Sequence, residues 1–265
     1  MQSLNEPTAA PGQRYAIEAE GLVIGYAGKA IGGPLDLQLE ADTILCLLGP
    51  NGSGKTTLFK TLMGLIPALA GRLRINNKPV EKWSRRAFAQ HVGYVPQAHD
   101  GVFPFTVKEV VLMGRSMHIG RYSVPGRVDH EVAEQCLQRL NITPLQDKPY
   151  NEISGGERQL TLIARALAQE PQVLIMDEPT ASLDFGNQIR VLEHIRQLKR
   201  AGMAVLLSTH QPEHAMQAAD RVALFRDGAI QHCGPPRQTM LPERLAWLYD
   251  LQPGQIPKLP DPGLN

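Results

Sequence analysis

The sequence contains few cysteines, no excess of either charge and no long hydrophobic run. Its three cysteines, Cys46, Cys136 and Cys233, have no metal-binding or redox spacing, which is typical of a protein from a reducing compartment. The 27 Lys and Arg residues nearly balance the 26 Asp and Glu residues, so bulk charge predicts no nucleic-acid partner. The longest apolar runs, such as 43–48 and 204–207, are far shorter than the roughly 18–20 residues of a membrane-spanning helix.

The ends of the chain carry no recognisable targeting pattern. The first 14 residues lack the basic start and apolar stretch of a secretory signal, so we expect a cytoplasmic location by default. Prolines are frequent from residue 253 onward, and they exclude a regular helix or central strand there, which predicts a surface tail. The 265 residues suffice for one large domain or two small ones with a substantial core.

Apolar residues follow two patterns that together predict an α/β fold. Alternation predicts three short antiparallel strands with one buried face, over residues 15–19, 22–26 and 35–39. Continuous apolar runs predict buried parallel strands, each leading through a polar loop into a helix, over residues 44–48, 173–176 and 204–207.

Helical patterns occupy most of the remaining chain. They cover residues 56–63, 107–115, 129–140, 157–169, 188–200 and 213–219. Asp227-Gly228, between apolar residues 221–225 and 229–233, predicts a β-hairpin. The stretch from about 98 to 151 lacks a buried strand, so we expect a helical subdomain inserted into the α/β core.

A glycine-rich loop follows the first buried run. Residues 49–56 read GPNGSGKT, which fits the G-x-x-x-x-G-K-[ST] pattern of a phosphate-binding loop between a strand and a helix. Gly52 and Gly54 let backbone N–H groups face a phosphate chain, and Lys55 can reach the terminal phosphates. The hydroxyl of Thr56 is suited to bind Mg²⁺. The alternative, a glycine-rich turn that binds nothing, is disfavoured by the flanking strand and helix.

Two adjacent carboxylates end the second buried run, at Asp177 and Glu178. In a protein with a phosphate-binding loop, this position places an acid beside the Mg²⁺ of the nucleotide. Asp177 would hold the metal, and Glu178 would polarise the water that attacks the γ-phosphate. Taken alone, the pair could instead be an acidic helix cap.

A second helix with an anion-binding start begins after Ile153-Ser-Gly-Gly-Glu157. Two phosphate-binding loops in one chain, with MDEPTASLD and STH following in order, resemble the ATP-binding subunits of ABC transporters. ISGGE is similar to their LSGGQ signature, with Ile153 in place of Leu and Glu157 in place of Gln. The resemblance covers about residues 15–235.

The resemblance implies a P-loop NTPase (RecA-like) core with an antiparallel β subdomain and the inserted helical subdomain. The ATPase domain would span residues 14–235, after a flexible segment over 1–13 and before a C-terminal helix and Pro-rich tail over 236–265. Its implied ligands are ATP and Mg²⁺.

Four further residues match functional positions of the family. Tyr26 matches the aromatic that stacks on adenine, although it could simply be a residue of the sheet core. Gln97 matches a glutamine that reaches the metal and the attacking water, although an exposed turn glutamine is the plain alternative. Asp184 matches the loop that crosses the dimer interface, and His210 matches the switch histidine on the γ-phosphate.

These assignments divide into three sets. The implied catalytic residues are Lys55, Gln97, Glu178 and His210. The implied metal ligands are Thr56, Gln97 and Asp177. The implied nucleotide contacts are Tyr26, Gly49, Pro50, Asn51, Gly52, Ser53, Gly54, Lys55, Thr56, Thr57, Ser154, Gly155, Gly156 and Asp184.

The resemblance also implies partners. ATP bound by one subunit would be closed over by Ser154 and Gly156 of a second copy, in a nucleotide-sandwich homodimer, with a heterodimer as the alternative. A separate permease would dock on the helical subdomain, where Phe103 and Phe105 are candidates for the docking surface, whereas Val110, Val111 and Met113 are expected to pack inside. An extracytoplasmic binding protein would be an indirect partner, and the chain would lie peripherally on the cytoplasmic face of the inner membrane.

The stretch TVKEVVLMGRSMHIG resembles ATPases of metal-chelate importers, for iron–siderophore, haem, cobalamin or molybdate-type cargo. The interpretation is therefore the ATPase of a metal-chelate importer. The alternative is a soluble ABC-type ATPase of an assembly process, such as iron–sulfur cluster scaffolding, which uses the same two loops.

Overall fold

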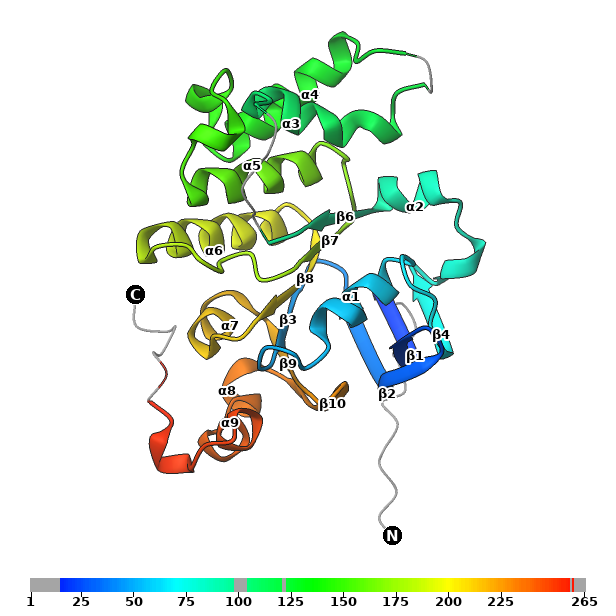
Figure 1. Cartoon of the computed structure of the whole chain (residues 1–265), viewed down its shortest axis with the longest axis vertical. Helices are drawn as coiled ribbons and strands as arrows, with labels where there is room; N and C mark the ends of the chain where they lie inside the picture. Colours follow the sequence, from blue (N-terminus) through cyan, green and yellow to red (C-terminus); the bar gives the residue numbers. More distant parts are fainter. Residues whose placement is uncertain (1–14, 98–103, 121–122, 258, 260–265) are drawn as a thin grey trace.

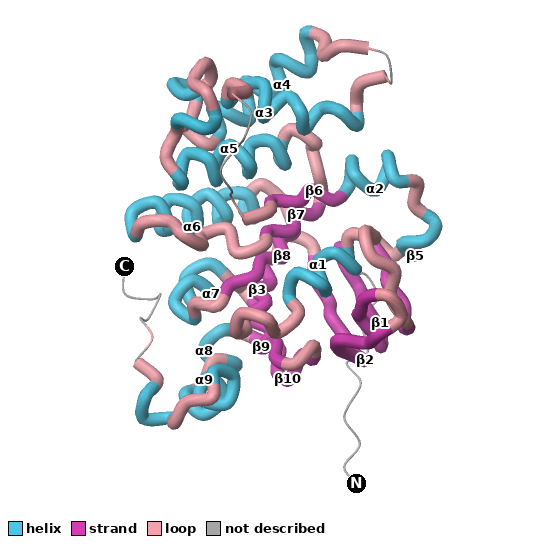
Figure 2. Tube along the Cα trace, in the orientation of Figure 1, coloured by secondary structure: helices cyan, strands magenta, loops and turns pink. Residues whose placement is uncertain are grey.

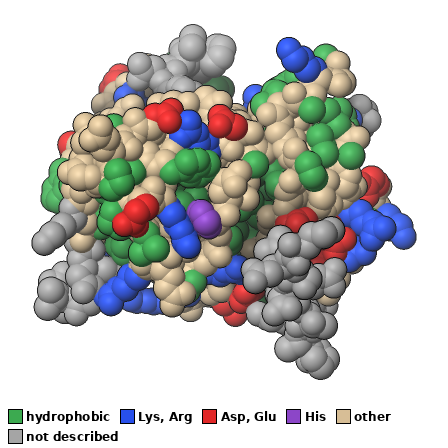
Figure 3. All heavy atoms as spheres, turned by 90° about the horizontal axis from the view of Figure 1, so that it is seen from below, with side chains coloured by type: hydrophobic (Ala, Val, Ile, Leu, Met, Phe, Trp, Pro, Cys, Tyr) green, Lys and Arg blue, Asp and Glu red, His purple; other side chains and the backbone are tan. Residues whose placement is uncertain are grey.

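A computed structural model describes residues 15–97, 104–120, 123–257 and 259 of the chain. Two sheets lie next to each other, with helices around them (Figures 1 and 2). None of the helices in the described part is long and apolar enough to cross a membrane. On the face shown in Figure 3, acidic and basic side chains lie interspersed, as the nearly balanced charge predicts.

The central sheet has six strands in the order β10-β9-β3-β8-β7-β6. They are β3 (Ile44–Leu48), β6 (Val92–Val95), β7 (Val173–Met176), β8 (Ala204–Thr209), β9 (Arg221–Arg226) and β10 (Ala229–Gly234). All neighbours pair in parallel except β9 and β10, which form the expected hairpin. The three predicted buried strands are confirmed. The parallel strand β6 was not predicted, because Gly93 leaves only a short, interrupted apolar run.

The second sheet is antiparallel, in the order β2-β1-β4-β5. Its strands are β1 (Tyr15–Tyr26), β2 (Lys29–Glu40), β4 (Ala70–Ile75) and β5 (Lys78–Pro79). The prediction of separate strands over 15–19 and 22–26 was wrong, because both belong to β1. The pairing of β1 with β2 shifts register between Ala19 and Leu22, and Gly21 there has a φ of 56°. This irregularity interrupts the alternation of apolar residues without ending the strand.

Nine α-helices occur in the described residues: α1 (Lys55–Leu62), α2 (Arg85–His91), α3 (Val107–Leu112), α4 (Arg127–Arg139), α5 (Gly155–Leu167), α6 (Phe185–Arg200), α7 (Pro212–Ala218), α8 (Pro236–Thr239) and α9 (Pro242–Tyr249). The helix predicted over 107–115 is α-helical only to Leu112, and a 3-10 segment continues over Met113–Met117. The helix α2 was missed because none of its residues is buried, so it has no apolar period.

Two apolar cores cover the two faces of the central sheet. One joins the antiparallel sheet and α1 to residues of β3, β7 and β8, with Phe59 fully buried. The other joins α3, α4, α5, α6, α7 and α9 to the opposite face. The helix α9, within the segment where a C-terminal helix was predicted, therefore packs against the core, and Ile256 and Leu259 of the predicted surface tail pack against it too.

The predicted helical insertion over 98–151 contains α3, α4 and short 3-10 segments in its described part. Val110 and Val111 are buried there, as expected, whereas Met113, the first residue of the 3-10 segment, is 42% exposed. Phe105 is 43% exposed, and Phe103 lies outside the described residues.

The hairpin turn between β9 and β10 holds the two sheets and the glycine-rich loop together. The N–H of Gly228 donates to the carbonyl oxygen of Ser53 at 3.1 Å. A Cβ on Gly32 of β2 would overlap the Cα and carbonyl oxygen of Gly228. Only glycine at position 32 allows this approach of backbone to backbone.

We therefore expect Gly32→Ala to lower the free energy of unfolding by about 1–3 kcal/mol, because backbone rather than a flexible side chain must move. Urea unfolding measures the change. Gly254→Ala is the matched control, because a Cβ there meets nothing within 4 Å. Equal unfolding midpoints for Gly32→Ala and the wild type would contradict the close approach.

Candidate functional site

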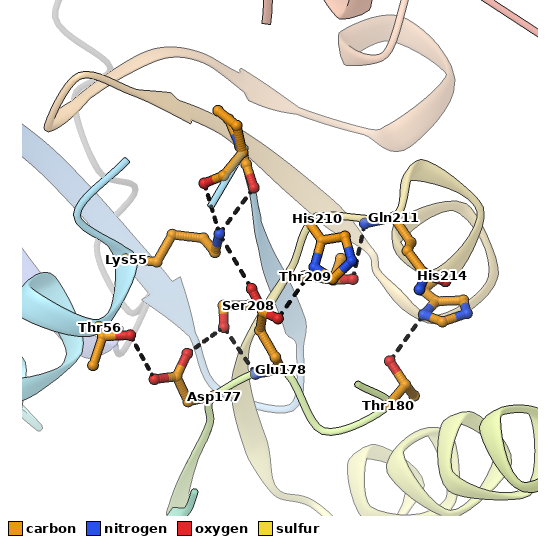
Figure 4. Close-up of polar contacts among 12 residues, drawn as sticks. Lys55, Thr56, Asp177, Glu178, Thr180, Ser208, Thr209, His210, Gln211 and His214 are labelled. Atoms are coloured by element: carbon orange, nitrogen blue, oxygen red, sulfur yellow. Dashed lines mark hydrogen bonds and ion pairs between the residues drawn. The ribbon is translucent and has the colours of Figure 1, made fainter. Parts of the chain in front are cut away.

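The glycine-rich loop connects the end of β3 to the start of α1. Gly52 and Gly54 have φ angles of 80° and 102°, which residues with a side chain rarely adopt. Lys55 is only 5% exposed, and its Nζ donates to the carbonyl oxygens of Gly49 at 2.9 Å and Pro50 at 3.0 Å (Figure 4). The loop thus encloses its own lysine.

A chain of hydrogen bonds links α1 to the ends of β7 and β8 (Figure 4). The Thr56 hydroxyl donates to Oδ2 of Asp177 at 2.8 Å. The fully buried Ser208 hydroxyl donates to Oδ1 of Asp177 at 2.7 Å and accepts from the N–H of Glu178 at 3.0 Å. Asp177 is therefore held at both oxygens, and Ser208 sets its position relative to Glu178.

Glu178 lies between two cationic or polar partners. Its Oε1 is 3.3 Å from Nζ of Lys55, and its Oε2 is 3.1 Å from Nδ1 of His210. The backbone of Glu178 has a φ of 46°, a conformation that costs a non-glycine residue about 1–3 kcal/mol and that clusters at functional sites. The contacts of the Glu178 side chain thus hold it in place, although its backbone just after β7 is strained.

Behind this group, a buried pair joins the loop after β7 to helix α7. The Oγ1 of Thr180 and Nδ1 of His214 are 2.9 Å apart, and both residues are buried. Burial lowers the pKa of His214, so the imidazole is neutral at pH 7 and suited to a hydrogen bond with a hydroxyl. The loop that carries Glu178 is therefore tied to the helix that follows His210.

These groups surround a cavity of about 720 Å³, a size that suits a small-molecule ligand. The predicted residues that line it come from four separate parts of the chain: Asn51, Gly52, Gly54, Lys55, Thr56, Thr57, Gln97, Asp177, Glu178 and His210. Gly49, Pro50 and Ser53 belong to the same loop, and the buried Oγ of Ser53 has no hydrogen-bond partner among the described residues. The cavity is thus lined by the backbone of the glycine-rich loop, by the Lys55 ammonium, and by side-chain oxygens that could bind a metal ion.

Tyr26 lies apart from the residues that line the cavity. It is 45% exposed, and its hydroxyl accepts a hydrogen bond from Nζ of Lys60 at 3.3 Å. The alternative that Tyr26 is a buried residue of the sheet is therefore wrong. Ile31, at the same end of the antiparallel sheet, lines the cavity instead.

The remaining predicted contacts form a second cluster that does not line this cavity. The Ser154 hydroxyl and N–H both donate to Oε2 of Glu157, at 2.7 and 2.8 Å, which caps α5 and lowers the pKa of Glu157. Asp184 caps α6 by accepting from the N–H of Asn187 at 2.9 Å. Gly155 lies beside Leu183, and a Cβ on Gly156 would overlap the Asn187 side chain, so the two loops pack closely.

The oxygen donors of the cavity fit a magnesium ion. The Thr56 hydroxyl and the Asp177 carboxylate already lie within hydrogen-bond distance of each other, and Gln97 lines the same cavity. No group of three or more His, Cys, Asp and Glu side chains suited to a metal occurs in the described residues. Magnesium is usually held by one or two carboxylates together with substrate phosphates and water, so this small donor set agrees with it.

Comparison with known proteins identifies the class. The profile of the ABC transporter family matches residues 33–181. The chain is 44% identical over 237 residues to an uncharacterized ABC transporter ATP-binding protein of Haemophilus influenzae, covering 89% of this chain and 90% of that protein. It is 38% identical to the hemin import ATP-binding protein HmuV of Streptomyces coelicolor, over 94% of this chain and 88% of that protein.

A solved structure agrees with this result. An inward-facing structure of a metal-chelate type ABC transporter superposes with a TM-score of 0.78 at 34% identity, covering 89% of both chains. The chain therefore belongs to the ABC transporter family, as one of its ATP-binding subunits. These subunits are ATPases coupled to transport, and their P-loop fold confirms the predicted α/β class. The alternative of a soluble assembly ATPase is not favoured by these relatives.

Ser208 and Tyr249 support the site but were not predicted from the sequence, and neither were four residues that line the cavity, Ile31, Ala181, Ser182 and Gln211. Ser208 belongs to the STH motif but was assigned no role, although a polar residue in an otherwise apolar strand indicates a buried hydrogen bond. Tyr249 donates from its hydroxyl to the carbonyl oxygen of His210 at 2.8 Å, across a separation of 39 residues. No local sequence pattern predicts the contact between Tyr249 and His210.

We expect Ser208→Ala to lower the free energy of unfolding by about 1–3 kcal/mol, because a buried carboxylate oxygen and a backbone N–H both lose their partner. Urea unfolding measures it, with the exposed Ser116→Ala as the matched control. An unchanged stability would show that Ser208 does not fix Asp177.

Proposed function

We propose that this chain hydrolyses ATP to drive import of a metal chelate through a separate permease. The observation that carries the proposal is the cavity, because residues from the glycine-rich loop, Gln97, the end of β7 and the end of β8 line it together. The names of the hemin import relative and of the metal-chelate type transporter support the cargo class.

The reaction follows from the positions of the charged groups. The glycine-rich loop and the N-terminus of α1 bind the phosphate chain, and Lys55 neutralises its terminal charge. Thr56, Asp177 and Gln97 would hold Mg²⁺, which stabilises the negative charge that develops on the phosphate oxygens. Glu178 takes the proton of the attacking water as general base.

His210 and Tyr26 complete the assignment. His210, which contacts Glu178 at 3.1 Å, orients the carboxylate and donates to the γ-phosphate. Tyr26 stacks on the adenine from the half-exposed end of β1. The role of Tyr26 needs a movement of its ring on ATP binding, because Tyr26 lies outside the cavity lining, whereas His210 already lines the cavity.

A second copy of the chain completes each site in this proposal. Ser154, Gly155 and Gly156, with Asp184 beside them, form a rigid cluster that does not line the cavity of their own chain. The helix start at Ser154 suits a γ-phosphate, so a facing copy supplies it. The nucleotide then lies between two identical chains, or between this chain and a related subunit.

The permease docks on the inserted helices. Phe105 and Met113 are 43% and 42% exposed near the start and the end of α3, which suits a helix of the partner in a groove. A solved relative at 26% identity is part of the ABC transporter complex cbiONQ. The chain then lies peripherally on the cytoplasmic face of the inner membrane, and an extracytoplasmic binding protein delivers the cargo to the permease.

We expect Glu178→Gln to lower ATP turnover by about 10²–10⁴-fold, because an amide cannot accept the proton of the attacking water. The variant retains ATP, so size-exclusion chromatography with Mg-ATP should show twice the mass of one chain. Glu243→Gln, an exposed change on α9, is the control and should behave as the wild type. A monomer at micromolar concentration would count against the sandwich.

The transport proposal is tested by purifying the tagged chain from detergent-solubilised native membranes. We expect two copies to elute with a polytopic membrane protein, and Phe105→Glu should reduce that recovery. Leu251→Glu, a change at an equally exposed side chain just after α9, a helix that lies far from α3 in Figure 1, should not. Elemental analysis of the purified complex after a metal chelate has been added measures whether the complex binds that cargo. Recovery of soluble proteins alone would contradict a permease as the partner.

A further inference from the structure

The C-terminal end of α9 contacts the loop that carries His210. The Tyr249 hydroxyl donates to the backbone carbonyl oxygen of His210 at 2.8 Å. The ring of Tyr249 is partly buried and packs against the core on the helical face of the central sheet. The hydroxyl therefore reaches His210 from a fixed position rather than from a free surface side chain.

The next residue fixes the same turn of chain to the central sheet. Both carboxylate oxygens of Asp250 accept from Nη2 of Arg226, at 3.0 and 2.9 Å. Nη1 of Arg226 donates to the carbonyl oxygen of Trp247, and its guanidinium lies 5.3 Å from the centre of the Trp247 ring. This combination of charge and stacking holds the end of α9 on β9.

Because Arg226 is followed by the 227–228 turn, the anchor of α9 also adjoins the glycine-rich loop. The N–H of Gly228 donates to the carbonyl oxygen of Ser53 at 3.1 Å. One short stretch of chain, Trp247–Asp250, thus contacts the histidine loop on one side and, through Arg226, the turn beneath the phosphate-binding loop on the other.

We propose that Tyr249 is a positioning residue for ATP hydrolysis, which holds His210 in register with Glu178 through its bond to the His210 carbonyl. This inference rests on the proposed function of the site. His210 follows the last residue of β8, so the sheet does not itself fix its carbonyl. Small displacements of a reacting group lower the rate by large factors. Loss of the Tyr249 hydrogen bond would let His210 move relative to Glu178, which it contacts at 3.1 Å.

The Tyr249 hydroxyl stays protonated, so it can always donate its hydrogen bond to the His210 carbonyl. Burial raises the pKa of the phenol well above its usual range, and the carboxylates of Glu213 and Glu178 raise it further. The hydroxyl therefore keeps its proton over the whole working range of pH. A phenylalanine at position 249 would retain the ring and remove only the donor.

We expect Tyr249→Phe to lower kcat for ATP hydrolysis by the purified full-length chain by about three- to tenfold, the effect of losing one hydrogen bond. The KM for ATP should stay within about twofold of the wild-type value, because the hydrogen bond that is lost goes to the His210 carbonyl and not to the glycine-rich loop. Tyr15→Phe, at the far end of β1, is the matched control. Equal thermal midpoints for all three proteins exclude a loss of fold.

A double-mutant cycle shows whether the effect passes through His210. In a His210→Ala background, where kcat is followed by phosphate release, Tyr249→Phe should cause no further loss. A loss of equal size in both backgrounds, or a Tyr249→Phe variant with the kcat of the wild type, would overturn the inference.

A spectroscopic measurement separates this inference from the proposed function. In the nucleotide-free protein with labelled histidine, Tyr249→Phe should shift the imidazole signal of His210 and leave that of the distant His130 unchanged. An unchanged His210 signal would refute the positioning role even if the wild type hydrolyses ATP. A wild-type chain without ATPase activity would instead refute the proposed function, whatever the signal shows.

Discussion

The site depends on the parallel register of three neighbouring strands. β3 pairs with β8 so that Leu48 faces Thr209, and β7 pairs with β8 so that Met176 faces Leu207. The residues that follow these strand ends are therefore delivered to one edge of the sheet: the glycine-rich loop, the Asp177–Glu178 pair and His210. A one-residue slip of any strand would turn its side chains to the other face and separate the groups that now lie within hydrogen-bond distance.

Burying the Lys55 ammonium next to the Glu178 carboxylate costs free energy of hydration. A buried ammonium and a carboxylate lose hydration, and only close partners compensate for it. Here Lys55 receives two carbonyl oxygens as well as Glu178. Glu178 also keeps a backbone conformation that is unfavourable for a residue with a side chain. The hydrophobic faces on both sides of the sheet hold this strain in place.

How much of this was predictable depends on whether a signal is local in sequence. The GPNGSGKT loop and the two carboxylates after β7 were predicted with their strand contexts, because each motif lies within a few residues. Tyr249 was not predicted, because its contact with His210 arises only after α9 has folded onto β9. Two short elements were missed for a related reason: α2 has no buried residue, and β6 is a four-residue run interrupted by Gly93, so neither gives a period.

The charges also suggest how binding and hydrolysis are linked in the proposed mechanism. Lys55 is paired with Glu178 at 3.3 Å, so the carboxylate proposed as general base is bound to the cation proposed to bind the phosphate. A terminal phosphate has more charge than a carboxylate and competes for Lys55, which releases one oxygen of Glu178 toward the attacking water. His210, held from behind by Tyr249, keeps the other oxygen in place. The base therefore becomes free only when its substrate is bound.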